Sequence, residues 1–357
     1  MSWTLLLRHL LDGRDLSGRE AAWAMDETMA GRATPASLAA FLVALRAKGE
    51  SVEEMRGLSD MMLAHAVSFA KADEVRALDI VGTGGDGSHS VNISTMSAIV
   101  AAGAGVTVVK HGNRAASSSS GSADVLEELG VRLDLSAERV AQIAHECGIT
   151  FCFAQAFHPS MRHAGPTRRE IGVPTAFNFL GPLTNPAQPT YSAVGVGDEV
   201  MAPIMAGVFA DRGKQAVVFR GDDGLDEVTP FTTTSLWWVA DGVVAPFVLD
   251  PRRVGFDFAP AEALRGQGPS FNAEIVRSVC GGQAGPIRDA VLLNAGIAMA
   301  LVGDDAAGGF AAGARRAPTD EGHVHERWAA GIEAARSAID SGRAARKLDA
   351  WVQATQS

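Results

Sequence analysis

The chain has 357 residues, of which 47% are hydrophobic and 20% charged, and its formal net charge is −10. This length exceeds that of a typical single domain, and the composition is that of a globular protein with a large core, not of a disordered or fibrous one. A nucleic-acid-binding role has little support, because such proteins usually carry a basic surface.

Four short helices are predicted in the first 70 residues. Leucines recur at helical spacing in residues 4–13. The sequences Ser17–Glu20 and Ser51–Glu54 match the capping box that opens a helix, and Thr34 followed by Pro35 is an N-cap with proline in the first helical position. Helices with so little connecting sequence predict a small helical domain.

The first of these helices is apolar over a wide arc. Trp3, Leu6, Leu7 and Leu10 share one face, and Leu5 and Leu11 extend it sideways. A helix that is apolar over such an arc needs a second packing partner. That partner is either the α/β domain or another copy of the same module.

The pattern changes near residue 71. Short apolar strands are predicted at 77–82 and 106–112, with a glycine-rich loop and a helix at 94–105 between them, which together form a parallel βαβ unit. Further strands are predicted at 148–154, 191–197, 214–221, 235–242 and 243–249, and further helices at 122–130 (with Ser122 as N-cap), 290–303 and 325–342. The predicted fold class is α/β, with a small N-terminal α-helical domain and a larger α/β domain whose central, mostly parallel sheet is flanked by helices.

We expect the helical domain to comprise residues 1–72, joined by the helix-breaking stretch at about 173–190. Residues 73–172 and 191–357 then form the α/β domain. Three cysteines without CxxC spacing are predicted to be buried thiols in a reducing compartment, and the first residues lack the apolar core of a signal peptide, so we expect a cytoplasmic protein.

The loop GTGGDGSHSVNIST, residues 82–95, contains G-x-G-x-x-G but does not match a dinucleotide site. That motif needs a helix that starts inside it and an acidic residue at the end of the second strand. Here the helix is predicted to start near Ser94, and the second strand ends in Lys110 and His111. A nicotinamide or flavin dinucleotide is therefore excluded.

A second loop, KHGNRAASSSSGS at residues 110–122, leaves the same carboxyl edge of the sheet. Glycines allow backbone N–H groups to turn toward an anion, and serine hydroxyls and a following helix N-terminus add donors. A solvated serine-rich turn is the alternative for one such loop alone. Two of them on consecutive strands predict a phosphate site.

Acidic residues follow a later strand, in GDDGLDEV at residues 221–228. Asp226 and Glu227, with Asp222 and Asp223 before them, are oxygen ligands of the kind that bind Mg²⁺ together with substrate phosphates. The alternative is an acidic surface turn, and the spacing of an EF-hand is absent. Carboxylates that face two phosphate loops predict a metal-bound diphosphate.

Four motifs, at residues 79–95, 108–131, 153–187 and 221–229, resemble those of the anthranilate phosphoribosyltransferases, and the likeness extends from the capped helices to residues 335–352. The resemblance implies transfer of phosphoribosyl from 5-phosphoribosyl 1-diphosphate to anthranilate in tryptophan biosynthesis, with Mg²⁺, two ions per chain. It also implies a homodimer formed by the helical domains, with a complete active site in each chain. We therefore expect Leu6 and Leu10 in the interface.

The resemblance also implies which residues bind each ligand. Phosphoribosyl diphosphate would contact Gly82, Gly85, Asp86, Ser90, Asn92, Ile93, Ser94, Thr95, Lys110, His111, Gly112, Asn113, Arg114, Ala115, Ala116, Ser117, Ser118 and Ser122. Anthranilate would contact Gly82, Asn113 and Arg168, with His111, His158 and His163 at its entry. Metal would bind Ser94, Asp226 and Glu227. Two positions depart from the family pattern: many members have Lys at Ser119 and His at Arg220.

No residue is expected to act as a chemical catalyst, because positioning and electrostatic stabilisation of the leaving diphosphate can supply most of the rate. Two alternatives remain at this stage. A pyrimidine nucleoside phosphorylase shares the implied fold but uses inorganic phosphate and needs no acidic pair. A non-enzymatic relative that binds nucleic acid conflicts with the net charge.

Overall fold

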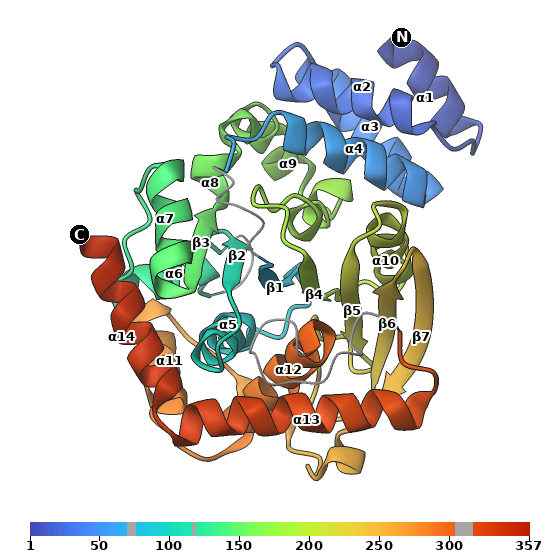
Figure 1. Cartoon of the computed structure of the whole chain (residues 1–357). Coiled ribbons are helices and arrows are strands. Elements are labelled where there is room, and N and C mark those ends of the chain that lie inside the picture. The colour runs from blue at the N-terminus through green and yellow to red at the C-terminus, as the bar shows by residue number, and fades with distance from the viewer. Residues whose placement is uncertain (70–75, 116–118, 304–316) are drawn as a thin grey trace.

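The computed structural model describes residues 1–69, 76–115, 119–303 and 317–357. A small helical unit sits on a larger α/β unit, as Figure 1 shows. The predicted fold class is confirmed: a mostly parallel sheet is flanked by helices and preceded by a helical bundle.

The helical unit consists of α1 (Trp3–Leu11), α2 (Gly18–Met29), α3 (Pro35–Lys48) and α4 (Val52–Ala64). The predicted capping chemistry is present at the start of three of them. Ser17 and Ser51 each exchange hydrogen bonds with the glutamate three residues later, and the Thr34 hydroxyl accepts from the N–H of Ser37. These local bonds give partners to backbone N–H groups of the first helical turn, which have no acceptor within the helix.

The apolar face of α1 is buried within the chain itself. Leu6 is 0% and Leu10 3% exposed, in one core cluster with residues of α2, α3 and α4. The Trp3 ring lies 5.3 Å from the Trp23 ring and 5.7 Å from that of Phe41, measured between centroids. The prediction that Leu6 and Leu10 lie in a dimer interface is therefore wrong, because the other helices of the unit already cover them.

The sheet has seven strands in the order β3-β2-β1-β4-β5-β6-β7. The first five in this order are mutually parallel, β6 pairs antiparallel with β5, and β7 pairs antiparallel with β6. The strands are β1 (Leu78–Gly82), β2 (Val108–Gly112), β3 (Ile149–Phe153), β4 (Tyr191–Gly195), β5 (Gln215–Gly221), β6 (Thr234–Ala240) and β7 (Val243–Leu249). All seven lie where strands were predicted.

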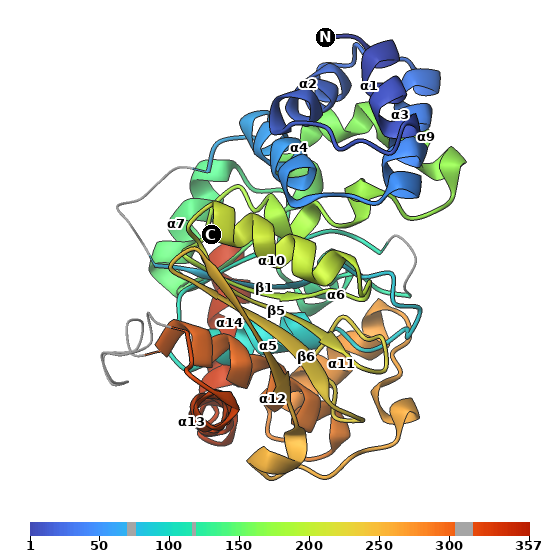
Figure 2. The same ribbon diagram turned by 90° about the vertical axis from the view of Figure 1, so that its right-hand side faces the viewer.

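Helices cover both faces of the sheet, as the side view in Figure 2 shows. The face away from the helical unit carries α5 (Ile93–Gly103), α12 (Pro286–Val302) and α13 (Glu321–Asp340). On the other face, α10 (Met201–Asp211) lies between the sheet and the helical unit. The remaining α-helices are α6 (Ser122–Leu129), α7 (Ala137–Cys147), α8 (Ala154–Phe157), α9 (Gly165–Ile171), α11 (Pro269–Cys280) and α14 (Arg343–Gln356).

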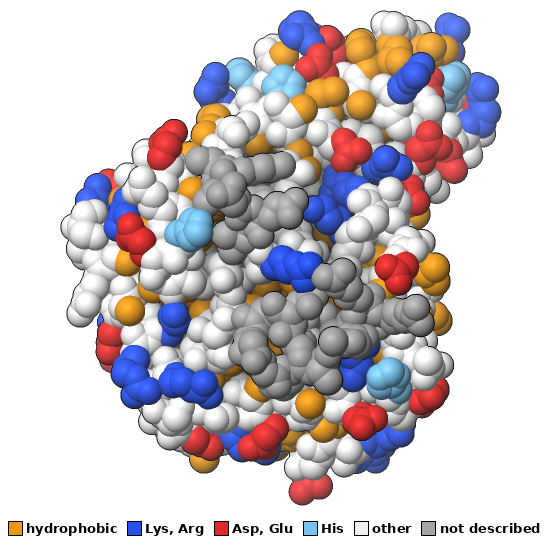
Figure 3. All heavy atoms as spheres, viewed as in Figure 1, with side chains coloured by type: hydrophobic (Ala, Val, Ile, Leu, Met, Phe, Trp, Pro, Cys, Tyr) orange, Lys and Arg blue, Asp and Glu red, His pale blue; other side chains and the backbone are white. Residues whose placement is uncertain are grey.

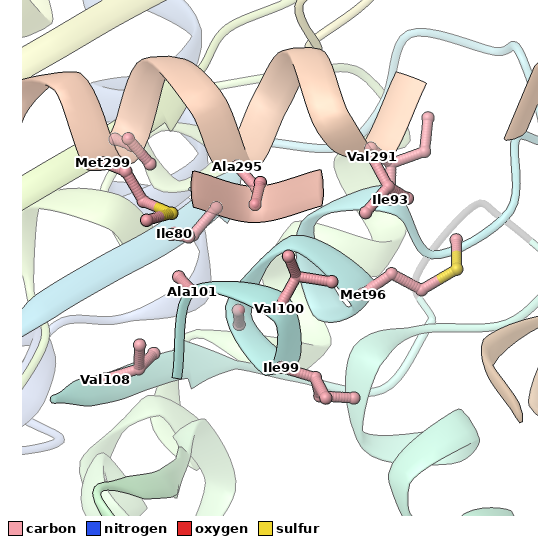
Figure 4. Close-up of a cluster of buried hydrophobic side chains, with 14 of the residues drawn as sticks. Ile80, Ile93, Met96, Ile99, Val100, Ala101, Val108, Val291, Ala295 and Met299 are labelled. Carbon is pink, nitrogen blue, oxygen red and sulfur yellow. The ribbon is translucent and has the colours of Figure 1, made fainter. Parts of the chain in front are cut away.

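Two cores follow from this layering. Ile80 of β1 points to α5 and α12, in the cluster drawn in Figure 4. Its neighbour Val81 points the other way, into the cluster that holds α10 and the helical unit. Strands covered on both faces have uninterrupted apolar sequences because alternate side chains enter different cores.

The stretch at 173–190 packs with the helical unit. Phe177, Phe179, Leu180 and Leu183 belong to the same apolar cluster as α1–α4 and α10. Arg212, which follows α10, donates to the Leu183 carbonyl at 2.7 Å and also bonds to Ser59 and Asp60 of α4. In the described part of the chain, no helix is both long and apolar enough to cross a membrane.

Candidate active site

The glycine loop after β1 turns back toward the later acidic loop. Gly84, Gly85 and Gly87 have φ values of 67°, 81° and 73°, a left-handed conformation that residues with a Cβ rarely adopt. The Gly84 N–H donates to Oδ2 of Asp226 at 2.6 Å. The Asp86 carboxylate accepts from the N–H of Ser88, at 3.0 Å, and from its hydroxyl. The helix that follows begins at Ile93, close to the predicted start.

Asp226 packs directly against two glycines. A Cβ added to Gly82 would lie 2.2 Å from Oδ2 of Asp226, and one added to Gly195 would lie 1.7 Å from its carbonyl oxygen. Gly82 and Gly195 are register partners at the ends of β1 and β4. The acidic loop therefore reaches these strand ends only because both positions lack a side chain.

Asp226 and Glu227 are both buried, each with 8% of its surface exposed. Burial raises the pKa of Asp226, and the nearby charge of Asp86 raises it further. Burial and the neighbouring Asp226 raise the pKa of Glu227 well above its usual range. Carboxylates held together out of water are destabilised as anions, so a cation at this place stabilises them.

Lys110 lies beneath the same loops. It is 1% exposed, and its ammonium donates to the Ile80 carbonyl and, at 3.1 Å, to the Ser94 hydroxyl. Burial lowers the pKa of Lys110, while Asp79, Glu227 and Asp226 act in the opposite direction. The structure thus brings together Ser94, Lys110, Asp226 and Glu227, which the sequence analysis assigned to one site.

Asp124 of α6 organises the second loop. Its carboxylate accepts from the N–H groups of Ala115 and Gly121, each at 2.9 Å, and from Arg114 at 3.1 Å. Arg114 also pairs with Glu127, so its guanidinium binds the following helix and not an open site. Ala116, Ser117 and Ser118 lie outside the described residues.

The start of α6 corrects one local prediction. The helix begins at Ser122, so that Gly121 and not Ser122 is the N-cap. A Cβ on Gly121 would lie 2.3 Å from the backbone nitrogen of Ala115. The close approach of the two ends of the loop therefore requires glycine at this position.

His111 and His158 form a buried pair whose ring centroids are 5.2 Å apart. Nδ1 of His111 bonds to the carbonyl of Gly181 at 3.0 Å, and Nε2 of His158 to that of Thr184 at 2.9 Å. A carbonyl only accepts, so each of these nitrogens carries the proton. The other two, Nε2 of His111 and Nδ1 of His158, are buried and have no hydrogen-bond partner among the residues that the structure describes.

Burial also keeps both histidines neutral. It lowers the pKa of His111 to about 3, with His158 contributing in the same direction. Burial likewise lowers the pKa of His158. Neither imidazole therefore supplies positive charge to the site at neutral pH.

Arg168 of α9 is a half-buried cation that has no ion pair in the described part of the chain, and its guanidinium lies 5.2 Å from the centre of the Phe177 ring. Burial lowers its pKa. An unpaired arginine of this kind is suited to bidentate binding of a carboxylate.

His163 is exposed and lies against Gly31 of the helical unit. A Cβ added to Gly31 would be 2.9 Å from the His163 ring.

The other predicted residues line the two loops. Asn92 donates to the Ser120 carbonyl at 3.0 Å, and Thr95 bonds to Ser122 at 3.2 Å, so hydrogen bonds join the glycine loop to the second loop. Ser90 and Asn113 lie on these loops, and Gly112 ends β2. Ser119 is exposed, and Arg220 donates to the Gly197 carbonyl at 3.1 Å.

Asp79 and Asn185 belong to the site region but were missed in the sequence. Asp79, 1% exposed within β1, accepts from the N–H of His111 at 3.1 Å and from Asn185 at 2.8 Å. Burial raises the pKa of Asp79 to about 6. A charged residue inside the apolar run ALDIVG was the signal that could have revealed it.

The donor set fits Mg²⁺ and not a metal held by protein ligands alone. Among the described residues, no group of three or more His, Cys, Asp or Glu side chains is arranged to hold a metal ion. Asp226, Glu227 and the Ser94 hydroxyl supply only oxygen. Mg²⁺ typically takes one or two carboxylates and completes its shell with water and substrate phosphates.

Comparison with known proteins places this site in a family. Residues 4–66 match the family described as "Glycosyl transferase family, helical bundle domain", and residues 74–345 match "Glycosyl transferase family, a/b domain". An anthranilate phosphoribosyltransferase of a Nocardioides species is 57% identical over 354 residues, which cover 99% of each chain. The chain belongs to the anthranilate phosphoribosyltransferase family. A relative with the same name from Thermobifida fusca is 54% identical over 99% of this chain and 97% of its own.

Solved structures of anthranilate phosphoribosyltransferases have the same fold. The Thermus thermophilus enzyme superimposes with a TM-score of 0.86 at 38% identity, over 99% of both chains. The Saccharomyces cerevisiae enzyme, in complex with PRPP and Mg, has a TM-score of 0.86 at 27% identity, over 99% of this chain and 98% of its own.

Proposed function

We propose that the protein transfers the phosphoribosyl group of 5-phosphoribosyl 1-diphosphate to the amine of anthranilate. The products are N-(5-phosphoribosyl)anthranilate and diphosphate, in the biosynthesis of L-tryptophan. The observation that carries the proposal is the buried pair Asp226 and Glu227, held against the glycine loop by Gly82 and Gly195. A pyrimidine nucleoside phosphorylase is not favoured, because inorganic phosphate does not require this acidic pair.

We assign the phosphoribosyl diphosphate to the two loops. Its phosphates accept from backbone N–H groups and hydroxyls of residues 82–95 and 110–122, and Gly84, Gly85 and Gly87 give the first loop a left-handed backbone. Lys110 lies below these loops and holds Ser94 in place through its hydroxyl. Loop donors that are not already bound to Asp86, Asp124 or Asp226 would stabilise the charge that develops on the leaving diphosphate.

We assign anthranilate to the space near Arg168, His111 and His158. Arg168 pairs with the carboxylate. His111 and His158 line the entry of this substrate as neutral side chains. An aromatic amine is already uncharged at neutral pH, so the residues only position it. Gly82, Asn113 and His163 complete the set we assign to this substrate.

Asp226, Glu227 and Ser94 would hold Mg²⁺, for which we propose two ions per chain. When bound, Mg²⁺ neutralises charge on the leaving diphosphate. The complex of the yeast relative with PRPP and Mg supports this assignment, and another structure of the yeast enzyme, in complex with 4-fluoroanthranilate, supports the aromatic substrate.

We further propose a homodimer that forms through the helical units. Leu5 and Leu11 of α1 are 43% and 78% exposed, and Val43 of α3 is 47% exposed. Figure 3 shows hydrophobic side chains gathered at the top of this unit, which is consistent with a covered surface.

We also propose a division of the chain into two domains and a cellular compartment. Residues 1–72 with about 173–190 form the dimerisation domain, and residues 73–172 with 191–357 form the catalytic domain; the apolar cluster shared by 176–183 and α1–α4 supports this division. We propose the cytoplasm as the compartment, since Cys147, Cys152 and Cys280 are all free and buried.

Loss of anthranilate fluorescence in the presence of phosphoribosyl diphosphate, with and without Mg²⁺, tests the reaction. We expect turnover only with a divalent cation. The double variant Asp226→Asn with Glu227→Gln should fold, because it removes charge that burial already opposes, but should lose turnover. Near-normal activity of this variant at limiting Mg²⁺ would show that the metal assignment is wrong.

A further inference from the structure

One side chain of α12 holds the backbone immediately after the acidic pair. Oδ1 of Asn294 accepts from the N–H of Val228 at 2.8 Å, and its Nδ2 donates to the carbonyl of Val228 at 2.9 Å. The same Nδ2 donates to the carbonyl of Ala290 at 2.9 Å, one helical turn earlier. Asn294 is 1% exposed. Both backbone groups of Val228 are therefore bound by a single amide that is itself fixed to its helix.

The helix that carries this amide is firmly packed. Figure 4 shows Val291, Ala295 and Met299, one turn apart along α12, pointing to α5 and β1. All three lie in the main core, with at most 6% of each exposed. A side chain on such a helix can hold its target at a set place, whereas a loop residue would move with the loop.

The neighbours of Val228 are held at separate points. Asp226 is seated between Gly82 and Gly195, and the N–H of Thr229 donates to the Thr234 hydroxyl at 3.2 Å. Glu227 has Asp226 before it and Val228 after it. The direction of its carboxylate therefore depends on Val228 keeping its orientation.

Asparagine is a poor choice for the interior of a helix on local grounds. It favours caps and turns, and here it interrupts the apolar run AVLLNAGIAMALV in the middle of a 17-residue helix. A long-range contact must therefore account for it. We propose that Asn294 is a positioning residue for the metal site: it holds Val228 so that the carboxylates of Asp226 and Glu227 face the glycine loop. This inference rests on the proposed function.

The test is metal binding without turnover. Mn²⁺, which has a paramagnetic signal, is titrated into the protein in the presence of inorganic diphosphate, and free Mn²⁺ is measured by electron paramagnetic resonance. Residues that orient metal ligands typically contribute about 10-fold to 100-fold to metal affinity. We expect Asn294→Ala to weaken Mn²⁺ binding about tenfold while the KM for anthranilate stays unchanged.

Leu301→Ala is the matched control. Leu301 lies at the far end of the same helix and is 0% exposed, so its truncation destabilises the core without touching the acidic loop. We expect it to lower the Tm at least as much as Asn294→Ala and to leave Mn²⁺ affinity at the wild-type value. If Asn294→Ala behaves in the same way, with a lower Tm and unchanged Mn²⁺ affinity, the role is purely structural and the proposal is overturned.

Two further variants distinguish the possible failures. Asn294→Ser retains one polar group in a smaller side chain and is used if Asn294→Ala does not fold; we expect it to weaken Mn²⁺ binding as well. In the background of Glu227→Gln, Asn294→Ala should weaken Mn²⁺ binding further only slightly, because the two residues act on one ligand. Full additivity overturns the proposal. If the double variant Asp226→Asn with Glu227→Gln still binds Mn²⁺ as the wild type does, the metal site is wrongly assigned, and the role proposed for Asn294 is wrong as well.

Discussion

Replacement of Gly82 by alanine tests whether the Asp226 carboxylate packs directly against Gly82. Gly82 ends β1, and it is absent from the glycines with positive φ, so the backbone accepts alanine. The added Cβ would lie 2.2 Å from Oδ2 of Asp226 and 3.0 Å from its Cγ. Contacts of this kind below 3.0 Å essentially never occur, so the carboxylate or the strand end must move.

The size of the effect follows from that contact. Relief of the overlap displaces the Asp226 carboxylate by about 1 Å, and a misplacement of this size near the reacting groups can cost about a hundredfold in rate. We therefore expect kcat/KM for phosphoribosyl diphosphate to fall about a hundredfold, which corresponds to ~2.7 kcal/mol of transition-state stabilisation. Overpacking should also lower the free energy of unfolding by roughly 1–3 kcal/mol.

The assay measures anthranilate consumption by fluorescence at saturating anthranilate and varied phosphoribosyl diphosphate, together with thermal unfolding. Gly268→Ala is the control, since Gly268 has φ −66° and no atom within 4 Å of an added Cβ. It should match the wild type in both measurements. If Gly82→Ala retains activity within threefold and an unchanged Tm, Asp226 is not seated against Gly82 and the reasoning fails.

Three further predictions concern other parts of the molecule. Arg168→Ala should raise the KM for anthranilate about tenfold to a hundredfold, from loss of a charge-assisted pair, and an equal effect on phosphoribosyl diphosphate would place Arg168 elsewhere. The imidazole NMR signal of His111 should not titrate between about pH 8 and pH 5.5, because burial lowers its pKa to about 3, and that of His158 should titrate below the ordinary pKa of a histidine; the stability gained from the neutral form of His111 is complete above the ordinary pKa of 6.5 and is lost as pH falls toward the folded pKa of about 3. Leu5→Glu with Leu11→Glu should give a folded monomer by light scattering, whereas a variant that stays dimeric would exclude α1 from the interface.

Elements whose signals are local were predictable from sequence. The side chains of Ser17, Thr34 and Ser51 each accept a hydrogen bond from the backbone N–H three residues later. All the residues that form the cap therefore lie within the sequence motif that predicts it. The strands were equally clear, because each is a short apolar run between turn residues. In contrast, α7, α10 and α11 were not predicted. In α10, Pro203 interrupts a run that is apolar nearly all round, so no helical period distinguishes it from a buried strand.

The partners of charged side chains were not predictable, since they depend on how the loops fold against neighbouring elements. Arg114 was assigned to the diphosphate because of its place in the second loop, yet in the structure it is bound to Asp124 and Glu127, ten and thirteen residues later. Lys110 is likewise turned inward to the Ile80 carbonyl. A motif places a residue at a site but does not show which of several nearby acceptors its side chain takes.

For the apolar residues of α1 as well, the sequence did not show which partner each side chain packs against. A wide apolar arc shows that a partner is needed, but packing within the chain decides which part of the arc is covered. Trp23 and Phe41 close over Trp3, and the core of the unit encloses Leu6 and Leu10. The sideways extension, Leu5 and Leu11, is the most exposed part of the arc. The sequence contained all of these residues but could not rank them by exposure.

An aspartate inside a phosphate-binding glycine loop raises an electrostatic problem that the structure makes specific. Asp86 is close enough to Asp226 to raise its pKa, and Glu227 adds a third carboxylate, while Lys110 is the one cation that the described surroundings place against them. When ionised, these three carboxylates outnumber the ammonium and oppose the binding of a diphosphate. We therefore propose that a divalent cation enters with the diphosphate. The glycine loop would then be the outer half of a metal site, with Asp86 part of its charge balance and not of a dinucleotide motif.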